Sequence, residues 1–236
     1  LIEGPETLSY AGLAALVAGA CVYLRELGIG QGERIGIALE NSIDHFVLFF
    51  ALMRIGAVPA ELPADDSADK LVATAHSYKL RAIFTGPRVT LPLGIVHHRL
   101  MPAWRAILAT RRGDHRADAG ADALHTITLT TGSTGVPGGI VTTHRQFWQR
   151  FAAQRDIFNA HRLYDPPGGT LVLTSSIRYG AFFRFLLGQI IVGGVSVITP
   201  EFAKPIELVR TIAAYDDVVA FVTANMCRLF IAAAPN

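Results

Sequence analysis

Residues 130–139 read Thr-Thr-Gly-Ser-Thr-Gly-Val-Pro-Gly-Gly, and this stretch is the most informative part of the chain. It follows a predicted buried strand at residues 125–130, and it precedes a helical pattern that starts near His144. Hydroxyl groups and glycines together can place several O–H and N–H donors around one anion, because glycine permits close backbone approach and positive φ. The stretch therefore indicates a phosphate cradle, although a surface turn uses the same residue types for geometric reasons.

The rest of the sequence gives this loop a setting in an α/β fold. Apolar runs of strand length alternate with helical patterns, and the strands are expected at residues 34–39, 57–62, 81–85, 125–130 and 170–174. Strands that are apolar on both faces and separated by helices favour a parallel sheet covered by helices. We predict a layered α/β protein with mostly parallel sheets flanked by helices, in which anions bind between a strand and a capped helix.

A polar segment at residues 111–122 interrupts the alternation and suggests a boundary. The sequence therefore predicts a first α/β subdomain at residues 1–118 and a second at residues 119–236, which carries the phosphate loop.

Two common nucleotide-binding signatures are missing. A Walker loop needs a lysine followed by serine or threonine after its last glycine, and this loop has neither. Gly28, Gly30 and Gly32 lie between a helix and a strand, whereas a dinucleotide fingerprint opens a helix after a strand. Any ATP must therefore be bound through a different kind of loop.

Composition excludes other classes of partner. The 236 residues are 51% hydrophobic and 17% charged with a formal net charge of +2, and the basic residues are scattered, so no nucleic-acid surface is expected. The apolar run at residues 181–198 is broken by Arg184 and by a glycine pair, which favours a helix, a turn and a buried strand over a membrane span. Cys21 and Cys227 lie in apolar helical patterns, are expected to be buried thiols, and fit a reducing cytoplasm. No metal cage is indicated.

At this point the sequence resembles one family specifically. Residues 130–139 are similar to the phosphate-loop signature of the adenylate-forming (AMP-binding) superfamily, which includes acyl-CoA synthetases and the adenylation domains of peptide synthetases. Further segments resemble that family in the same order, at residues 8–10, 30–35, 39–42 and 54–59. The resemblance covers nearly the whole chain and corresponds to the N-terminal part of such enzymes.

The resemblance implies a reaction. A carboxylic acid attacks the α-phosphate of Mg-ATP, giving an acyl-adenylate and pyrophosphate, and the acyl group then passes to a thiol such as coenzyme A. ATP, Mg²⁺ and CoA are the ligands it implies, and a small-molecule carboxylic acid is the substrate. Stabilisation of the phosphate charge would come from Thr130, Thr131, Gly132, Ser133, Thr134 and Gly135.

Two positions depart from the family pattern. Gly138 stands where the family commonly has a lysine after the loop's proline, and one lost charged hydrogen bond is worth roughly 1.5–3 kcal/mol, or about ten- to a hundred-fold. Ile177 takes the place of a histidine found in many acyl-CoA synthetases. In the same segment Tyr179 and Gly180 are candidates for the edge of an acyl pocket, with simple core packing as the alternative.

Later motifs of the family are absent from these residues, including those for adenine, ribose and the adenylation lysine. We therefore expect the chain by itself to be nearly inactive and to associate through exposed apolar surface as a homo-oligomer. The leading interpretation is part of an acid–CoA ligase. An amino-acid adenylation domain and a catalytically silent nucleotide-binding or structural domain are the alternatives.

Overall fold

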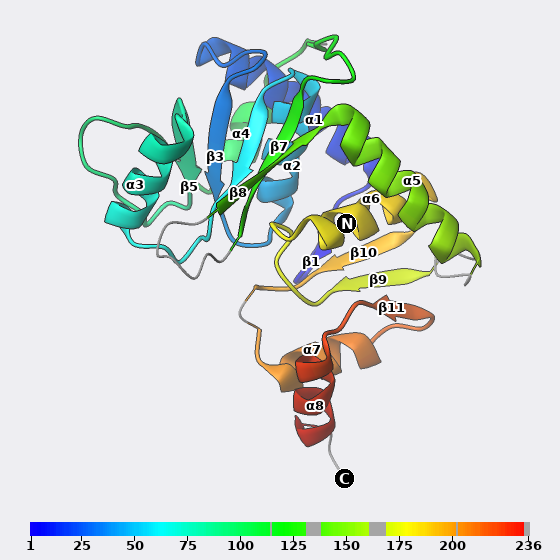
Figure 1. The fold of residues 1–236 in the computed structure, drawn as a ribbon. Coiled ribbons are helices and arrows are strands. Elements are labelled where there is room, and N and C mark those ends of the chain that lie inside the picture. The colour runs from blue at the N-terminus through cyan, green and yellow to red at the C-terminus, as the bar shows by residue number, and fades with distance from the viewer. Residues whose placement is uncertain (114, 131–137, 161–168, 202, 234–236) are drawn as a thin grey trace. The chain divides into compact units, whose positions relative to one another are not determined.

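The computed structural model describes residues 1–113, 115–130, 138–160, 169–201 and 203–233, and it contains two open sheets with helices packed beside them (Figure 1). This is the mostly parallel, helix-flanked α/β architecture expected from the alternation of strands and helices. By contact density the chain forms two compact units. One unit holds residues 11–40 and 44–149, and the other holds residues 1–10, 41–43 and 150–236.

These units differ from the division predicted between residues 118 and 119. The physical reason is strand pairing, because β7 (Leu124–Thr130) pairs with β4 (Val58–Glu61) and so extends the first sheet. The polar segment at residues 111–122 is thus a connection that precedes an inner strand of this sheet.

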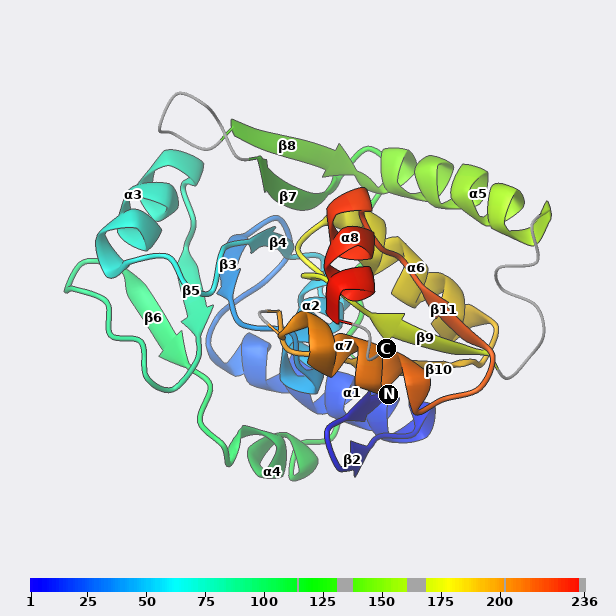
Figure 2. The same cartoon turned by 90° about the horizontal axis from the view of Figure 1, so that it is seen from below.

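The first unit is built on a six-stranded sheet in the order β6-β5-β3-β4-β7-β8, parallel except for the β7–β8 pair. Figure 2 shows β5 and β6 side by side at one edge. Its other elements are α1 (Tyr10–Glu26), β3 (Arg34–Ala38), α2 (Ile43–Arg54), α3 (Ala68–Tyr78), β5 (Ala82–Thr85), β6 (Val96–Arg99), α4 (Trp104–Ala109) and β8 (Gly138–Thr143).

Helices α1 and α2 owe their positions to apolar side chains and to a glycine. Most of α2 is fully buried, with Phe46, Val47, Leu48, Ala51 and Leu52 all at 0% exposure, as expected for a helix that is hydrophobic all round. A Cβ on Gly19 of α1 would lie 2.3 Å from the carbonyl oxygen of Leu108, so α4 packs directly on the α1 backbone. Ser67 caps α3, since its hydroxyl accepts a hydrogen bond from the Lys70 N–H.

The second unit is built on a five-stranded sheet in the order β11-β9-β10-β1-β2, parallel except for the β1–β2 pair. Strand β1 pairs with β10 through Ile2 and Val197, so the start of the chain is part of this sheet. Its elements are β1 (Ile2–Glu3), β2 (Glu6–Thr7), β9 (Thr170–Leu173), α6 (Gly180–Ile191), β10 (Val195–Ile198), α7 (Pro205–Ala213), β11 (Val218–Ala220) and α8 (Ala224–Ala233), with α5 (His144–Ala160) entering it at residue 150.

The apolar run at residues 181–198 forms α6, a turn at Gly193 with φ +74° and strand β10, as the sequence predicts. Within the described residues we find no helix with the length and hydropathy needed to cross a bilayer. The cysteine prediction is half right: Cys21 is buried, but Cys227 is exposed, because this face of α8 is not covered by any described residue.

Candidate active site

The predicted phosphate loop joins two paired strands. Thr130, the last residue of β7, pairs with Gly138, the first residue of the antiparallel strand β8. The sequence predicted a helix from about His144 after the loop, and α5 begins there, but it did not predict the six-residue strand β8 that lies between the loop and this helix. The run from Ile140 to Thr143 is β-branched throughout, which explains its preference for a strand.

The helix after the strand is capped where the sequence indicated. The Thr143 hydroxyl accepts a hydrogen bond from the Gln146 N–H at 3.3 Å, and the Gln146 side chain accepts one from the Thr143 N–H at 3.1 Å. This reciprocal pair is a capping box, and α5 therefore begins at His144. The N-terminus of α5 lies at the opposite end of β8 from the loop, so the loop's own donors must supply its affinity for phosphate.

The exit of the loop is fixed by a close contact between an aromatic ring and a glycine. A Cβ on Gly139 would lie 2.4 Å from Cε1 of Tyr78, the last residue of α3. Only glycine allows the ring to rest on the strand at this distance. Tyr78 therefore helps to hold β8 in register where it leaves the loop.

Most of the loop itself lies outside the described residues. Thr131, Gly132, Ser133, Thr134 and Gly135 belong to this group, and of Thr130 only the backbone is described. The structure thus places the two ends of the predicted phosphate site, whereas the hydrogen-bond donors between them are assigned from the sequence alone.

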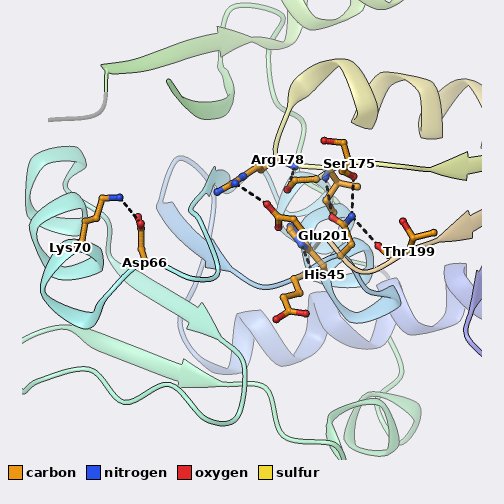
Figure 3. Close-up of polar contacts among 11 residues, drawn as sticks. His45, Asp66, Lys70, Ser175, Arg178, Thr199 and Glu201 are labelled. Carbon is orange, nitrogen blue, oxygen red and sulfur yellow. Dashed lines mark hydrogen bonds and ion pairs between the residues drawn. The ribbon is translucent and has the colours of Figure 1, made fainter. Parts of the chain in front are cut away.

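A second group of candidate residues lies in the five-stranded unit, after strand β9. The buried side chain of Asn41 makes three hydrogen bonds there. Its amide N–H groups donate to the carbonyls of Ser175 at 2.9 Å and Thr199 at 3.2 Å, and its amide oxygen accepts from the Ile177 N–H at 3.1 Å (Figure 3). Asn41 therefore holds the segments that follow β9 and β10 together at the carboxyl edge of the sheet.

Within this segment the side chains have distinct environments. Ile177, at the family's histidine position, is buried at 4% exposure and offers no polar group. Arg178 forms an ion pair with Glu201 at 2.8 Å (Figure 3). The Arg178 guanidinium lies 5.3 Å from the centre of the Tyr179 ring. Tyr179 is 44% exposed and directly precedes α6, whose first residue is Gly180. A surface aromatic beside a neutralised arginine is compatible with an apolar ligand at this edge.

Several histidines among the described residues pack against aromatic rings or form hydrogen bonds. His125 stacks on Phe147 at 4.1 Å, and burial, followed by the nearby His144, lowers the pKa of His125 to about 3. His98 stacks on Phe84 at 4.9 Å, and His97 lies 2.7 Å from the Thr85 hydroxyl. No group of three or more metal-ligating side chains occurs in the part of the chain that the structure describes.

Comparison with known proteins identifies the family. The family model described as "AMP-binding enzyme" matches residues 1–236. The chain belongs to the AMP-binding enzyme family. The architecture agrees: the N-terminal subdomain of NpsA from Klebsiella oxytoca, solved with 3-hydroxybenzoyl-AMSN, superposes with a TM-score of 0.80 at 19% identity over 98% of this chain and 57% of that chain.

Relatives within the AMP-binding family have several different activities. They include olefin beta-lactone synthetase of Xanthomonas campestris pv. campestris, 31% identical over 69% of this chain and 32% of the relative, and 4-coumarate–CoA ligase 2 of Oryza sativa subsp. japonica, 29% identical over 64% and 31%. A polyketide synthase–nonribosomal peptide synthetase of Aspergillus flavipes is 27% identical over 82% of this chain and 5% of the relative. The chain thus spans at most about a third of the length of these relatives.

Proposed function

We propose that the protein carrying this chain activates a carboxylic acid with ATP. The observation that carries the proposal is the loop at residues 130–139, set between β7 and β8, in a chain that matches the AMP-binding family over its whole length. Hydroxyl and amide donors of this loop suit phosphate oxygens, and parallel strands direct the loop to the carboxyl edge of the sheet, where ligands of α/β proteins bind.

The chemistry proceeds in two steps. A carboxylate oxygen attacks the α-phosphorus of ATP, the bond from that phosphorus to the β-phosphate oxygen breaks, and pyrophosphate leaves. A thiol then attacks the acyl carbonyl, gives its proton to a base, and releases AMP, which leaves a thioester. We infer that coenzyme A is the thiol, as in the CoA ligase relative, and that the reaction takes place in the cytoplasm.

The residues of this chain act by binding and orientation. The backbone amides and hydroxyls from Thr130 to Gly135 stabilise the departing pyrophosphate charge, which is electrostatic catalysis without a protein nucleophile. Mg²⁺ accompanies ATP and neutralises its phosphates. Asn41 fixes the segment that carries Tyr179 and Gly180, which we propose as one edge of the acyl pocket.

An amino-acid adenylation domain is a second candidate, favoured by the match to a nonribosomal peptide synthetase over 82% of the chain. Such a protein shares the first step but transfers the acyl group to a carrier domain. The silent-domain alternative is supported by Gly138 and by the buried Ile177, which leave two family positions without their polar side chains.

One assay separates these candidates. Full-length protein is tested for exchange of labelled pyrophosphate into ATP with panels of fatty, aryl and amino acids. Exchange with fatty or aryl acids, followed by thioester formation with CoA, is the expected result. Exchange limited to amino acids would favour the carrier-linked enzyme, and retained ATP binding without exchange on any panel would favour the silent domain.

A further inference from the structure

The six-stranded unit contains a polar hollow at the edge opposite the phosphate loop. It has a volume of about 340 Å³ and is lined by residues that precede β3 and β4, by the last turn of α1 and by residues 115–118. The phosphate loop leaves β7 at its carboxyl end, whereas this hollow lies where the parallel strands begin. A five-residue strand such as β3 spans roughly 15 Å, so the two places are well separated.

Two arginines line the hollow without an ion-pair partner. Arg25 and Arg116 form no salt bridge with any described residue, although acidic residues are near them in sequence. Two of those acids are engaged elsewhere: Glu26 pairs with Arg111 at 2.6 Å, and Glu33 pairs with Arg81, which leaves Asp118 as the acid that lines the hollow. The guanidinium groups of the hollow therefore keep their donors available, and each can bind two oxygens in its planar fork.

The remaining lining includes three further polar side chains. His115 and Gln31 bring additional N–H donors, and Asp118 brings one carboxylate. Without His115, the lining carries two positive charges and one negative charge. This leaves a net charge of about +1, together with more donors than acceptors.

The hollow is held open by packing of its wall on the body of the unit. The Ala117 N–H donates to the carbonyl of Arg54 at 2.9 Å, and the Gln31 side chain donates to the Asp118 carbonyl at 3.5 Å. Gly56, at φ +74°, lies so close that an added Cβ would be 2.9 Å from Cβ of Ala117. A Cβ added to Gly30 would lie 3.0 Å from Nη1 of Arg25. The lack of a side chain at Gly56 and Gly30 thus lets Ala117 and the Arg25 guanidinium lie close to the backbone.

We propose that this hollow is a second anion site, which binds the phosphate group of a small phosphorylated molecule. Guanidinium forks from two separate elements, with an imidazole and an amide, match the several oxygens of a phosphate better than the two of a carboxylate. The volume exceeds that of a bare phosphate and lies at the lower end of the range for small-molecule sites, so it leaves space for a second phosphate or a sugar. The proposal does not depend on the adenylation activity.

The test measures binding of inorganic phosphate, pyrophosphate and ribose 5-phosphate to the full-length protein by calorimetry at constant ionic strength. Arg25→Gln/Arg116→Gln is expected to weaken binding by about tenfold or more for each charged contact removed. The matched control, Arg99→Gln/Arg210→Gln, removes two exposed arginines outside the hollow and is expected to leave binding unchanged. Any binding at the phosphate loop is common to all variants, so only the differences between them count.

A gain-of-binding variant keeps the test independent of folding problems. Asp118→Asn removes the one carboxylate of the hollow and is expected to tighten phosphate binding several-fold. Stronger binding of pyrophosphate would indicate a diphosphate ligand, and stronger binding of ribose 5-phosphate a sugar phosphate. Equal affinity of the wild type, the double variant and Asp118→Asn, equal loss in the control pair, or no saturable binding of any probe would overturn the proposal.

Discussion

Nε2 of His45 lies 2.9 Å from Oε2 of Glu61, and both side chains are buried, at 1% and 5% exposure. The other ring nitrogen, Nδ1, lies 3.3 Å from the carbonyl oxygen of Glu40. The contact between His45 and Glu61 joins α2 to β4 inside the six-stranded unit.

Removing only one partner of this pair is expected to lower the stability of the fold strongly. His45→Phe leaves Glu61 without its partner in the core and should lower the free energy of unfolding by about 3–5 kcal/mol. The double variant His45→Phe/Glu61→Leu replaces both polar groups and should recover most of the loss. Urea unfolding at pH 7 measures both. A double variant no more stable than His45→Phe would show that the cost comes from packing and not from the unpaired carboxylate.

Acid sensitivity should depend on His125, whose ring nitrogens have no hydrogen-bond partner among the described residues. Its folded pKa is about 3 against an ordinary value of 6.5, so as pH falls below about 6.5 the unfolded chain binds the proton first. Stability should therefore fall by up to about 1.4 kcal/mol per pH unit between pH 6.5 and pH 3. In His125→Leu this slope should be reduced. Parallel unfolding titrations on His76→Gln, at an exposed position, supply the control, and an unchanged slope in His125→Leu would contradict the prediction.

The three hydrogen bonds of Asn41 predict a difference between two substitutions. Asn41→Asp keeps the oxygen that accepts from Ile177 but points a second oxygen at the carbonyls of Ser175 and Thr199. We expect a loss of about 1–3 kcal/mol or more in stability, at least as large as for Asn41→Leu. If the segment also borders the acyl pocket, the KM for the acid should rise more than the KM for ATP in either variant. Equal changes in both KM values would argue against a role at the pocket.

Replacing Gly138 by lysine tests whether the loop lacks a charged contact. Gly138 is exposed at the first position of β8. One added charged hydrogen bond to phosphate should raise the rate of pyrophosphate exchange by about ten- to a hundred-fold. Gly86→Lys places the same charge at a position with open space around it and serves as the control. Equal rates in Gly138→Lys and the wild type would show that the loop binds phosphate adequately without the lysine.

Sequence reasoning succeeded where apolar runs have the length of one element. The strands near residues 34, 58, 82 and 124 and the turn at Gly193 follow directly from local composition. Strand β8 was missed because its two glycines indicate a loop. Its β-branched residues favour a strand, and its pairing with β7 stabilises that strand. Pairings over long distances in sequence, such as Ile2 with Val197 or Asn41 with Thr199, have no local signal at all.

The pairing of Thr130 with Gly138 also determines how freely the loop can vary. Seven residues, 131–137, lie between two positions that the sheet register fixes. Closing a longer loop between fixed ends costs only about 0.6 kcal/mol for each doubling of its length. Insertions there should therefore barely disturb folding while displacing every donor meant for phosphate. Stability screens would overlook such variants, and only measurements of nucleotide affinity would detect them.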